Sequence, residues 1–334
     1  MKIKRILSAI VLVVLIGSAV MMASCASCFS DKSSSGTLYN VMLIGAIEKA
    51  DEQTLNGASW RAIKKYAEGT ELLYKYYEPS SAEVNNYIHT DNMQSSEAVR
   101  ASIQTQINIA SNQRAKDKSV IVITGQDGIE TYLSDIIGNE KLDYAKAFSS
   151  TWFLLVGGST VSDASNADKL GVRTMSLILN EKDYGALCGY TAVKSGYNNI
   201  GYLGSDSAYS ASFKAGIQEG IAKANTELSS TDARLISNDS YTDSADLRAE
   251  SLYAECDIVI PENTVFEDAL KRSCGEKKFV SLTENSEKSA FACVIDYDAL
   301  QTVIQNTLTA TFNLGENKEA RTVGAAENIF KIAE

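Results

Sequence analysis

The side chains that could act on a ligand in this sequence are polar groups that follow short apolar runs. Hydroxyls, amides and carboxylates donate or accept hydrogen bonds, so the set is typical of recognition of a small polar molecule. Gly125 and Gly204 precede two of the groups, and a residue without a side chain lets a ligand approach the backbone closely. The candidate ligand-binding residues are Asp51, Thr54, Asn56, Gln126, Asp127, Ser205, Asp206, Tyr209, Glu262, Asn263, Glu284 and Asp296.

The later members of this set bear on the chemistry of the ligand. Glu262, Asn263, Glu284 and Asp296 would form a markedly acidic rim. Carboxylates accept hydrogen bonds and attract positive charge, so such a rim favours a cationic or polyhydroxylated ligand over an anionic one. Tyr209 could stack on a flat ligand while it donates a hydrogen bond.

Each of these candidates also has a purely structural interpretation. Thr54 and Asn56 belong to residue types that begin helices well, so both could be capping residues. Tyr209 could be a surface tyrosine in a Ser-rich turn, and any one of the acidic residues could be a solvated surface group. The sequence leaves these alternatives open.

The sequence offers little support for an enzyme, a metal site or a nucleic-acid partner. It has no G-x-S-x-G elbow, no G-x-x-x-x-G-K loop and no complete G-x-G-x-x-G after a strand. His89 is the single histidine, and Cys188, Cys256, Cys274 and Cys293 form no C-x-x-C pair, which disfavours zinc and a Cys-His nucleophile. The net charge of −11 disfavours nucleic acid and anionic membrane surfaces. We expect no catalytic residue, no metal and no cofactor.

The four scattered cysteines have two interpretations. A disulfide between Cys256 and Cys274 is conceivable in an exported protein. Buried free thiols in strands and helices are the alternative.

The first residues resemble a bacterial lipoprotein export signal. Residues 1–5 carry three positive charges, residues 6–20 are almost wholly apolar, and small residues precede Cys25. The apolar run is shorter than the ~20 residues that a spanning helix needs, so we predict a signal peptide over 1–24 that is removed. Cys25 is the expected lipidation site, and its acyl chains would hold the protein on the membrane. Cys28 is a poorer choice, and an uncleaved signal anchor is the alternative.

The elements that must position the candidate residues alternate between strand and helix. A polar tether over 25–36 leads to about 300 residues, which suits two lobes better than one core. The alternation predicts an α/β fold of two doubly wound parallel-sheet lobes joined by a hinge, with ligands bound at the carboxyl ends of strands. The predicted strands cover 39–45, 72–77, 119–124, 152–158, 172–179, 199–204, 234–238, 257–260 and 278–283, and the predicted helices cover 55–68, 95–115, 184–195, 210–224, 244–253 and 265–272.

The expected lobes are assembled from separate segments. The N-terminal lobe takes residues 37–176 and a returning segment near 284–310, and the C-terminal lobe takes 177–283 and a portion near 311–334. The first crossover between them is expected within 172–180, and the later ones near Thr283 and Asp296.

Six stretches carry a resemblance to a known family: 51–56 with Trp60, 180–190, 200–204, 213–220, 241–245 and 256–260. They resemble the basic membrane protein (BMP) family of ABC-transporter substrate-binding lipoproteins, which includes the PnrA-like purine-nucleoside binders. The clearest is 180–190, which is similar to the family's E-E-A-G-F-L-A-G-Y helix. Each motif is partial, but together with the signal they cover nearly the whole chain.

The departures from the family fall where its ligand would be bound. Pro261 to Thr264 stand in place of a glycine pair, 281–284 in place of a G-V-D-x-D turn, and Asp296 in place of a lysine. Leu55 replaces an aromatic residue of the first turn. The aspartate and lysine that would bind a ribose in the family therefore have no counterpart at the matching positions.

The resemblance implies a periplasmic-binding-protein type I fold and a receptor role outside the cell. The expected partners are a small polar solute, with a nucleoside as one option, an ABC-transporter permease and the membrane through the lipid anchor, with the protein a monomer. A ligand-sensing lipoprotein of the same fold, acting with a membrane signalling receptor, is the alternative. A surface enzyme is a third class, which no motif supports.

Overall fold

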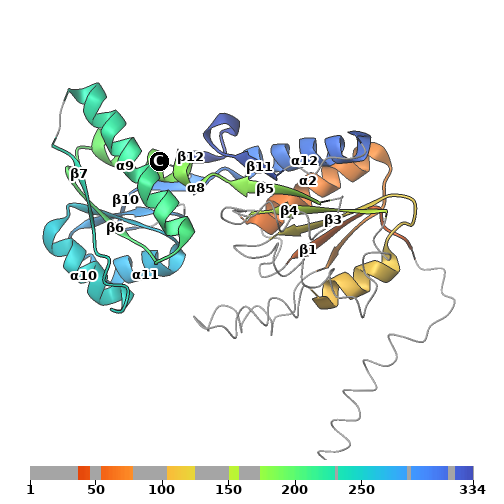
Figure 1. The fold of residues 1–334 in the computed structure, drawn as a ribbon, viewed down its shortest axis with the longest axis horizontal. Helices are drawn as coiled ribbons and strands as arrows, with labels where there is room; N and C mark the ends of the chain where they lie inside the picture. Colours follow the sequence, from red (N-terminus) through yellow and green to blue (C-terminus); the bar gives the residue numbers. More distant parts are fainter. Residues whose placement is uncertain are drawn as a thin grey trace, which may run out of the picture. The chain divides into compact units, whose positions relative to one another are not determined.

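The structure is a computed structural model that describes residues 37–45, 54–77, 104–124, 150–157, 174–229, 232–283, 287–314 and 320–333. Within these residues the chain forms two six-stranded sheets, each with its own helices (Figure 1). The predicted signal peptide, the tether and Cys25 lie outside the described residues, as do Asp51, Gln126, Asp127 and Glu284. In the described part of the chain, no helix is long and apolar enough to cross a membrane.

The N-terminal sheet has the strand order β11-β5-β4-β3-β1-β2, and all of its strands pair in parallel. Its central strands are continuous apolar runs buried on both faces, as helices on both sides of a parallel sheet require. Helices α2 (Leu55–Thr70) and α12 (Tyr297–Leu314) contribute to the same core. The strands are β1 (Val41–Gly45), β2 (Tyr74–Tyr77), β3 (Ser119–Thr124), β4 (Thr151–Val156), β5 (Thr174–Leu179) and β11 (Ala320–Val323).

The C-terminal sheet has the order β12-β10-β9-β8-β6-β7 and is parallel except for the last pair, β10 with β12. Its strands are β6 (Asn199–Leu203), β7 (Arg234–Ser237), β8 (Ile258–Pro261), β9 (Lys278–Ser281), β10 (Ser289–Ile295) and β12 (Phe330–Ala333). The helices of this lobe are α8 (Glu181–Lys194), α9 (Ala208–Leu228), α10 (Ala245–Glu255) and α11 (Thr264–Ser273).

The two sheets share one strand order, since β1 to β5 correspond in position to β6 to β10, and β11 corresponds to β12. This confirms the predicted fold class of two parallel-sheet α/β lobes. The chain passes from the first sheet to the second after β5, within the predicted segment 172–180.

The later segments divide between the lobes differently from the expected boundaries. β10 pairs with β9, so residues 289–295 belong to the C-terminal sheet, and the chain returns at Asp296 into α12. β11 pairs with β5, so residues 320–323 belong to the N-terminal sheet. The physical reason is that β10 pairs with β9 as the fifth parallel strand of the second sheet, so the chain crosses back to the N-terminal lobe only after β10. The last crossing, into β12, comes correspondingly later than expected.

Capping side chains fix where the helices begin. Five capping side chains each accept a hydrogen bond from a backbone N–H of the first turn that follows: those of Thr54, Asn180, Ser207, Ser244 and Asn263. Such residues satisfy N–H groups that have no partner within the helix. The polar residues that follow the strands therefore also set the positions of the helices.

Helices α8 and α9 are in contact through their backbones. A Cβ placed on Gly185, Gly189, Gly216 or Gly220 would lie between 2.0 and 2.3 Å from a backbone oxygen of the opposite helix. No real Cβ comes so near an oxygen, so only glycine permits this packing. These glycines belong to the stretches that resemble the BMP family, so that part of the resemblance reflects helix packing.

Candidate functional site

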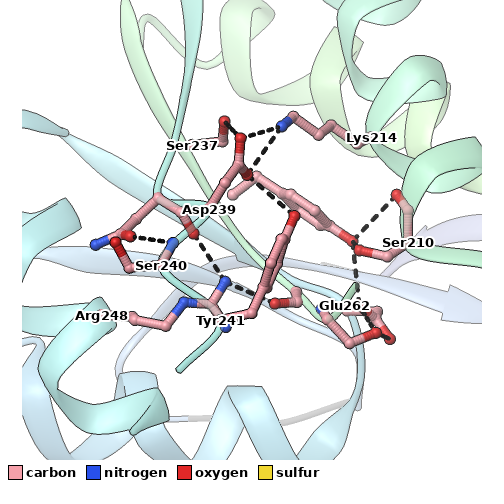
Figure 2. Close-up of polar contacts among 12 residues, drawn as sticks. Ser210, Lys214, Ser237, Asp239, Ser240, Tyr241, Arg248 and Glu262 are labelled. Atoms are coloured by element: carbon pink, nitrogen blue, oxygen red, sulfur yellow. Dashed lines mark hydrogen bonds and ion pairs between the residues drawn. The ribbon is translucent and has the colours of Figure 1, made fainter. Parts of the chain in front are cut away.

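The strand order of the C-terminal sheet places a switch point at the carboxyl end of β6. β6 lies between β7 and β8, so the connections that leave β6 and β7 run in opposite directions along the sheet. In open α/β sheets of this order, ligands bind outside the carboxyl ends of the strands at such a point. The residues that follow β6, β7 and β8 are thus the candidate site, and Figure 2 shows their polar contacts.

Glu262 joins the segments that follow β6 and β8. It is 7% exposed, and its carboxylate accepts hydrogen bonds from the backbone N–H of Ser205 at 2.5 Å and from the Ser205 hydroxyl at 2.9 Å. The Tyr202 hydroxyl lies 3.4 Å from the same carboxylate and 2.8 Å from the hydroxyl of Ser210. Burial raises the pKa of Tyr202, so this phenol stays protonated and remains a donor.

Arg248 joins the segments that follow β6 and β7. Its Nη2 donates to the carbonyl oxygens of Gly204 at 2.7 Å and Asn238 at 2.8 Å (Figure 2). The guanidinium carbon lies 4.9 Å from the centre of the Tyr241 ring and 5.9 Å from that of Phe266. The side chain is therefore both a hydrogen-bond donor and a cation packed on aromatic rings.

Asp239, Lys214 and Tyr241 form a second polar group beside Arg248. The carboxylate of Asp239 accepts from Lys214 Nζ at 3.2 Å and from the Tyr241 hydroxyl at 3.1 Å (Figure 2). Partial burial opposes ionisation of Asp239, but the bonds from Lys214 and Tyr241 outweigh it and lower the pKa of this carboxyl group. Tyr241 keeps 41% of its surface exposed while its hydroxyl and its ring are both held.

The structure brings together two of the predicted site residues, Ser205 and Glu262. Asp206 is exposed next to them. Tyr209 lies on the first turn of α9, where its ring is stacked on Phe213 with 6.0 Å between centroids and 11° between planes. One face of the predicted stacking residue thus packs against the core of the lobe.

Two other predicted residues cap helices, and a third is buried within one. The Thr54 hydroxyl caps α2 by accepting from Gly57 N at 3.0 Å, and Asn56 is 2% exposed within that helix. The Asn263 side chain caps α11. The capping alternative therefore holds for Thr54 but not for Asn56, which lies inside α2, and capping also explains Asn263.

Asp296 stands where the chain leaves β10 for α12. Its Oδ1 accepts from the backbone N–H groups of Asp298 at 3.1 Å and Ala299 at 3.0 Å, and its Oδ2 pairs with Lys331 at 3.3 Å. Partial burial opposes ionisation, but these bonds lower the pKa of the carboxyl group. Of the expected acidic rim, Glu262 is consequently engaged inside the lobe, and Asn263 and Asp296 act at helix starts.

Sequence reasoning missed Lys214, Asp239, Tyr241 and Arg248. Tyr241 lies in a stretch that resembles the BMP family, and Asp239 directly follows the predicted strand 234–238, so both carried a usable signal. Lys214 also lies in a stretch that resembles the family, 213–220, whereas Arg248 carried no signal, because charged residues within helices are normally solvated.

The described cysteines Cys188, Cys256, Cys274 and Cys293 are buried free thiols. Burial raises the pKa of Cys256 to about 11, so this thiol is not ionised at neutral pH. Among the residues that the structure describes, no group of three or more His, Cys, Asp and Glu side chains is placed to hold a metal ion.

Comparison with known proteins gives structural likeness without sequence likeness: no protein-family model matches the chain, and no curated protein is similar to it. An ABC transporter solute-binding protein from Conexibacter woesei DSM 14684 has a TM-score of 0.56 at 14% identity, over 89% of this chain and 88% of that one. One from Burkholderia graminis C4D1M, in complex with D-arabinose, has a TM-score of 0.51 at 11% identity, over 90% of this chain and 96% of that one. A mutant XylFII–LytSN complex has a TM-score of 0.57 at 9% identity, over 89% of this chain and 98% of that one. The chain thus has the fold of type I periplasmic binding proteins.

Proposed function

We propose that this protein binds a small polar solute outside the cell and delivers it to the permease of an ABC transporter. The observation that carries the proposal is the convergence of polar residues from three strand ends at the switch point of the C-terminal sheet. Solved solute-binding proteins of ABC transporters with the same fold support it. No turnover is part of this function.

We propose a polyhydroxylated solute with a flat face, such as a nucleoside or a sugar. The exposed ring of Tyr241 is held by Asp239 at its hydroxyl and by Arg248 at its face, so it offers a stacking surface that needs little ordering on binding. Asp206 is exposed nearby as a hydrogen-bond acceptor for hydroxyl groups.

An anionic solute fits this edge less well. Lys214 is already paired with Asp239, and Arg248 is only 4% exposed, so neither cation is presented to solvent as a free partner. Asp206, Asp239 and Glu262 meanwhile repel negative charge. We therefore assign the site to neutral or cationic solutes.

Delivery requires that the solute favour one arrangement of the protein over another. In this proposal the N-terminal lobe supplies further contacts from the loops that follow its own strands, where Asp51, Gln126 and Asp127 were predicted. A solute shifts an equilibrium between open and closed forms only by contacts that one form lacks. The permease would then recognise the closed form.

A thermal-shift screen tests the solute class. Protein without residues 1–24 is heated with nucleosides, aldoses, amino acids and polyamines, and a bound solute at a hundredfold excess over its Kd should stabilise it by about 2.7 kcal/mol. If no nucleoside or sugar raises the melting temperature while another class does, the proposed solute class is wrong.

Two tyrosine variants test the stacking surface. Tyr241→Ala should weaken binding of the solute found in the screen by about 1–3 kcal/mol, the usual contribution of aromatic stacking to binding of a base. Tyr190→Ala is the matched control, since the Tyr190 hydroxyl also bonds a carboxylate, Glu227 at 2.6 Å, and a lysine lies 5.2 Å from its ring centre, but on helix α8. Equal affinities for the two variants would argue against stacking on Tyr241.

A ligand-sensing role is the second candidate, because the XylFII–LytSN complex is similar to this chain in fold. In that role the protein would present its solute-bound state to a membrane receptor. Deleting the gene would then change transcription in response to the solute and leave its uptake unchanged. Loss of radiolabelled solute uptake on deletion supports the transport role instead.

The proposed location is the outer face of the cytoplasmic membrane, held by a lipid on Cys25. The sequence pattern of residues 1–25 supports this location. Labelling cells with a radioactive fatty acid should mark the wild-type protein, and Cys25→Ser should remove the label.

A further inference from the structure

Arg248 is a buried cation that has no carboxylate partner among the described residues. It is 4% exposed, and its Nε has no hydrogen-bond partner. A buried charge is usually compensated by an opposite charge or by a complete set of hydrogen bonds. Burial of this charge costs desolvation, whereas its two bonds to backbone carbonyls stabilise the lobe, so an effect of Arg248 on stability has to be separated from an effect on binding.

Apart from the ring of Phe266, the groups that Arg248 contacts belong to the candidate site. Gly204 follows β6, Asn238 follows β7, and a single nitrogen atom bonds the carbonyl oxygens of both. The same guanidinium lies beside the exposed ring of Tyr241. Because the guanidinium is planar and rigid, it fixes these three groups relative to one another, which a lysine ammonium at the end of a flexible chain does not.

We propose that Arg248 is a positioning residue, which holds the segments after β6 and β7 and the ring of Tyr241 in the arrangement that solute binding requires. This role rests on the proposed function. Arg248 acts through Gly204, Asn238 and Tyr241 and does not itself contact the solute. A residue of this kind lowers the ordering that binding would otherwise demand.

Lys277 provides a control with the same kind of bonds at the amino ends of the strands of this sheet, although it is exposed. Its Nζ donates to the backbone carbonyls of Tyr253 and Cys256, which precede β8, and Lys277 itself precedes β9. Each edge of the sheet thus has a cation that bonds two backbone carbonyls. Arg248 bonds residues at the carboxyl ends of the strands, and Lys277 bonds residues at their amino ends.

The experiment compares affinity with stability in Arg248→Met, Arg248→Lys and Lys277→Met. Binding of adenosine, guanosine, D-ribose and D-arabinose is measured by calorimetry, and stability by urea unfolding without solute. We expect both Met variants to lose stability. Arg248→Met should also weaken the affinity of the folded protein by roughly 10–100-fold, the range found for residues that orient metal ligands. Lys277→Met should stay within about twofold of the wild type, because surroundings far from a site couple weakly to it.

The conservative variant separates charge from geometry. Arg248→Lys keeps the positive charge but can bond only as a flexible point donor, so it should recover part of the stability and little of the affinity. It also serves as the test protein if Arg248→Met does not fold.

Three results would overturn the role of Arg248, and they can be told apart. Wild-type affinity in Arg248→Met or in Arg248→Lys, with lowered stability, would make Arg248 purely structural. An equal loss of affinity in Lys277→Met would make the effect a general consequence of destabilisation. If none of the four probes binds the wild-type protein, the proposed solute class fails first and the role of Arg248 falls with it.

Discussion

Gly216→Ala should destabilise the C-terminal lobe, although alanine is the better helix former. The Cβ added at Gly216 would lie 2.0 Å from the carbonyl oxygen of Lys182 and 3.0 Å from the backbone nitrogen of Ala186, both on α8. A carbon and a carbonyl oxygen in contact normally lie about 3.3–3.6 Å apart, so α8 and α9 must separate by roughly 1 Å or more. The contacts at Gly185 and Gly189 would loosen together with this one.

The expected size of the effect follows from two opposing contributions. Overpacking of a tightly packed contact typically costs about 1–3 kcal/mol and occasionally more. Replacement of glycine by alanine within a helix returns about 0.5–1 kcal/mol. Since the clash here is with backbone that has no rotamer to move, we expect a net loss of about 2 kcal/mol, or a melting temperature lower by roughly 4–12 °C.

Gly69→Ala is the matched control for this prediction. Gly69 also lies within a helix, α2, but nothing is within 4 Å of the Cβ that it would gain. Only the helix propensity changes, so this variant should be more stable than the wild type by about 0.5–1 kcal/mol. Urea unfolding followed by circular dichroism measures both variants. A Gly216→Ala protein as stable as the wild type would refute the backbone contact between α8 and α9.

Three further predictions concern buried and capping groups. Glu267→Ala should lower the free energy of unfolding, measured in urea, by about 2–3 kcal/mol. The reason is that this fully buried carboxylate accepts from the N–H of Leu282 at 2.8 Å, and the N–H would lose its partner. Asp268→Ala, at an exposed neighbour, should change the free energy of unfolding by less than about 0.5 kcal/mol. Asp296→Asn keeps an oxygen that can cap α12 but loses the ion pair with Lys331 and the negative charge at the helix start, so it should cost about 0.5–1 kcal/mol at neutral pH. Folding lowers the pKa of Asp296, so its charge contributes fully to the free energy of unfolding above pH 3.8, the ordinary pKa of the group. This contribution is lost as the pH falls through the pKa of the folded state. The stabilities of the wild type and the variant should therefore converge in acid unfolding curves. Alkylation mapped by mass spectrometry should leave Cys256 unmodified in the native protein and modify it in urea, since burial keeps this thiol protonated; rapid native labelling would contradict its burial.

The repetitive part of the fold was accessible from the sequence because it depends on local patterns. Uninterrupted apolar runs such as those of β3 and β4 are typical of strands covered on both faces, and their alternation with helices predicted two parallel sheets. The exchange of β10 and β11 between the lobes was not accessible. Which sheet a strand joins depends on its neighbours in space, and the apolar pattern of a strand is the same in either sheet.

The candidate site divides in the same way. The sequence by itself placed polar residues at the ends of strands, because a βα unit needs them to turn the chain and cap the next helix, as Asn263 and Thr54 do. Only the tertiary structure decided which of them meet. Glu262 reaches Ser205 across 57 positions, and Arg248 reaches Gly204 across 44, because parallel strands bring their carboxyl ends to one edge. Residue type and spacing record local geometry, whereas a hydrogen bond between distant segments exists only once the sheet has set the distance between them.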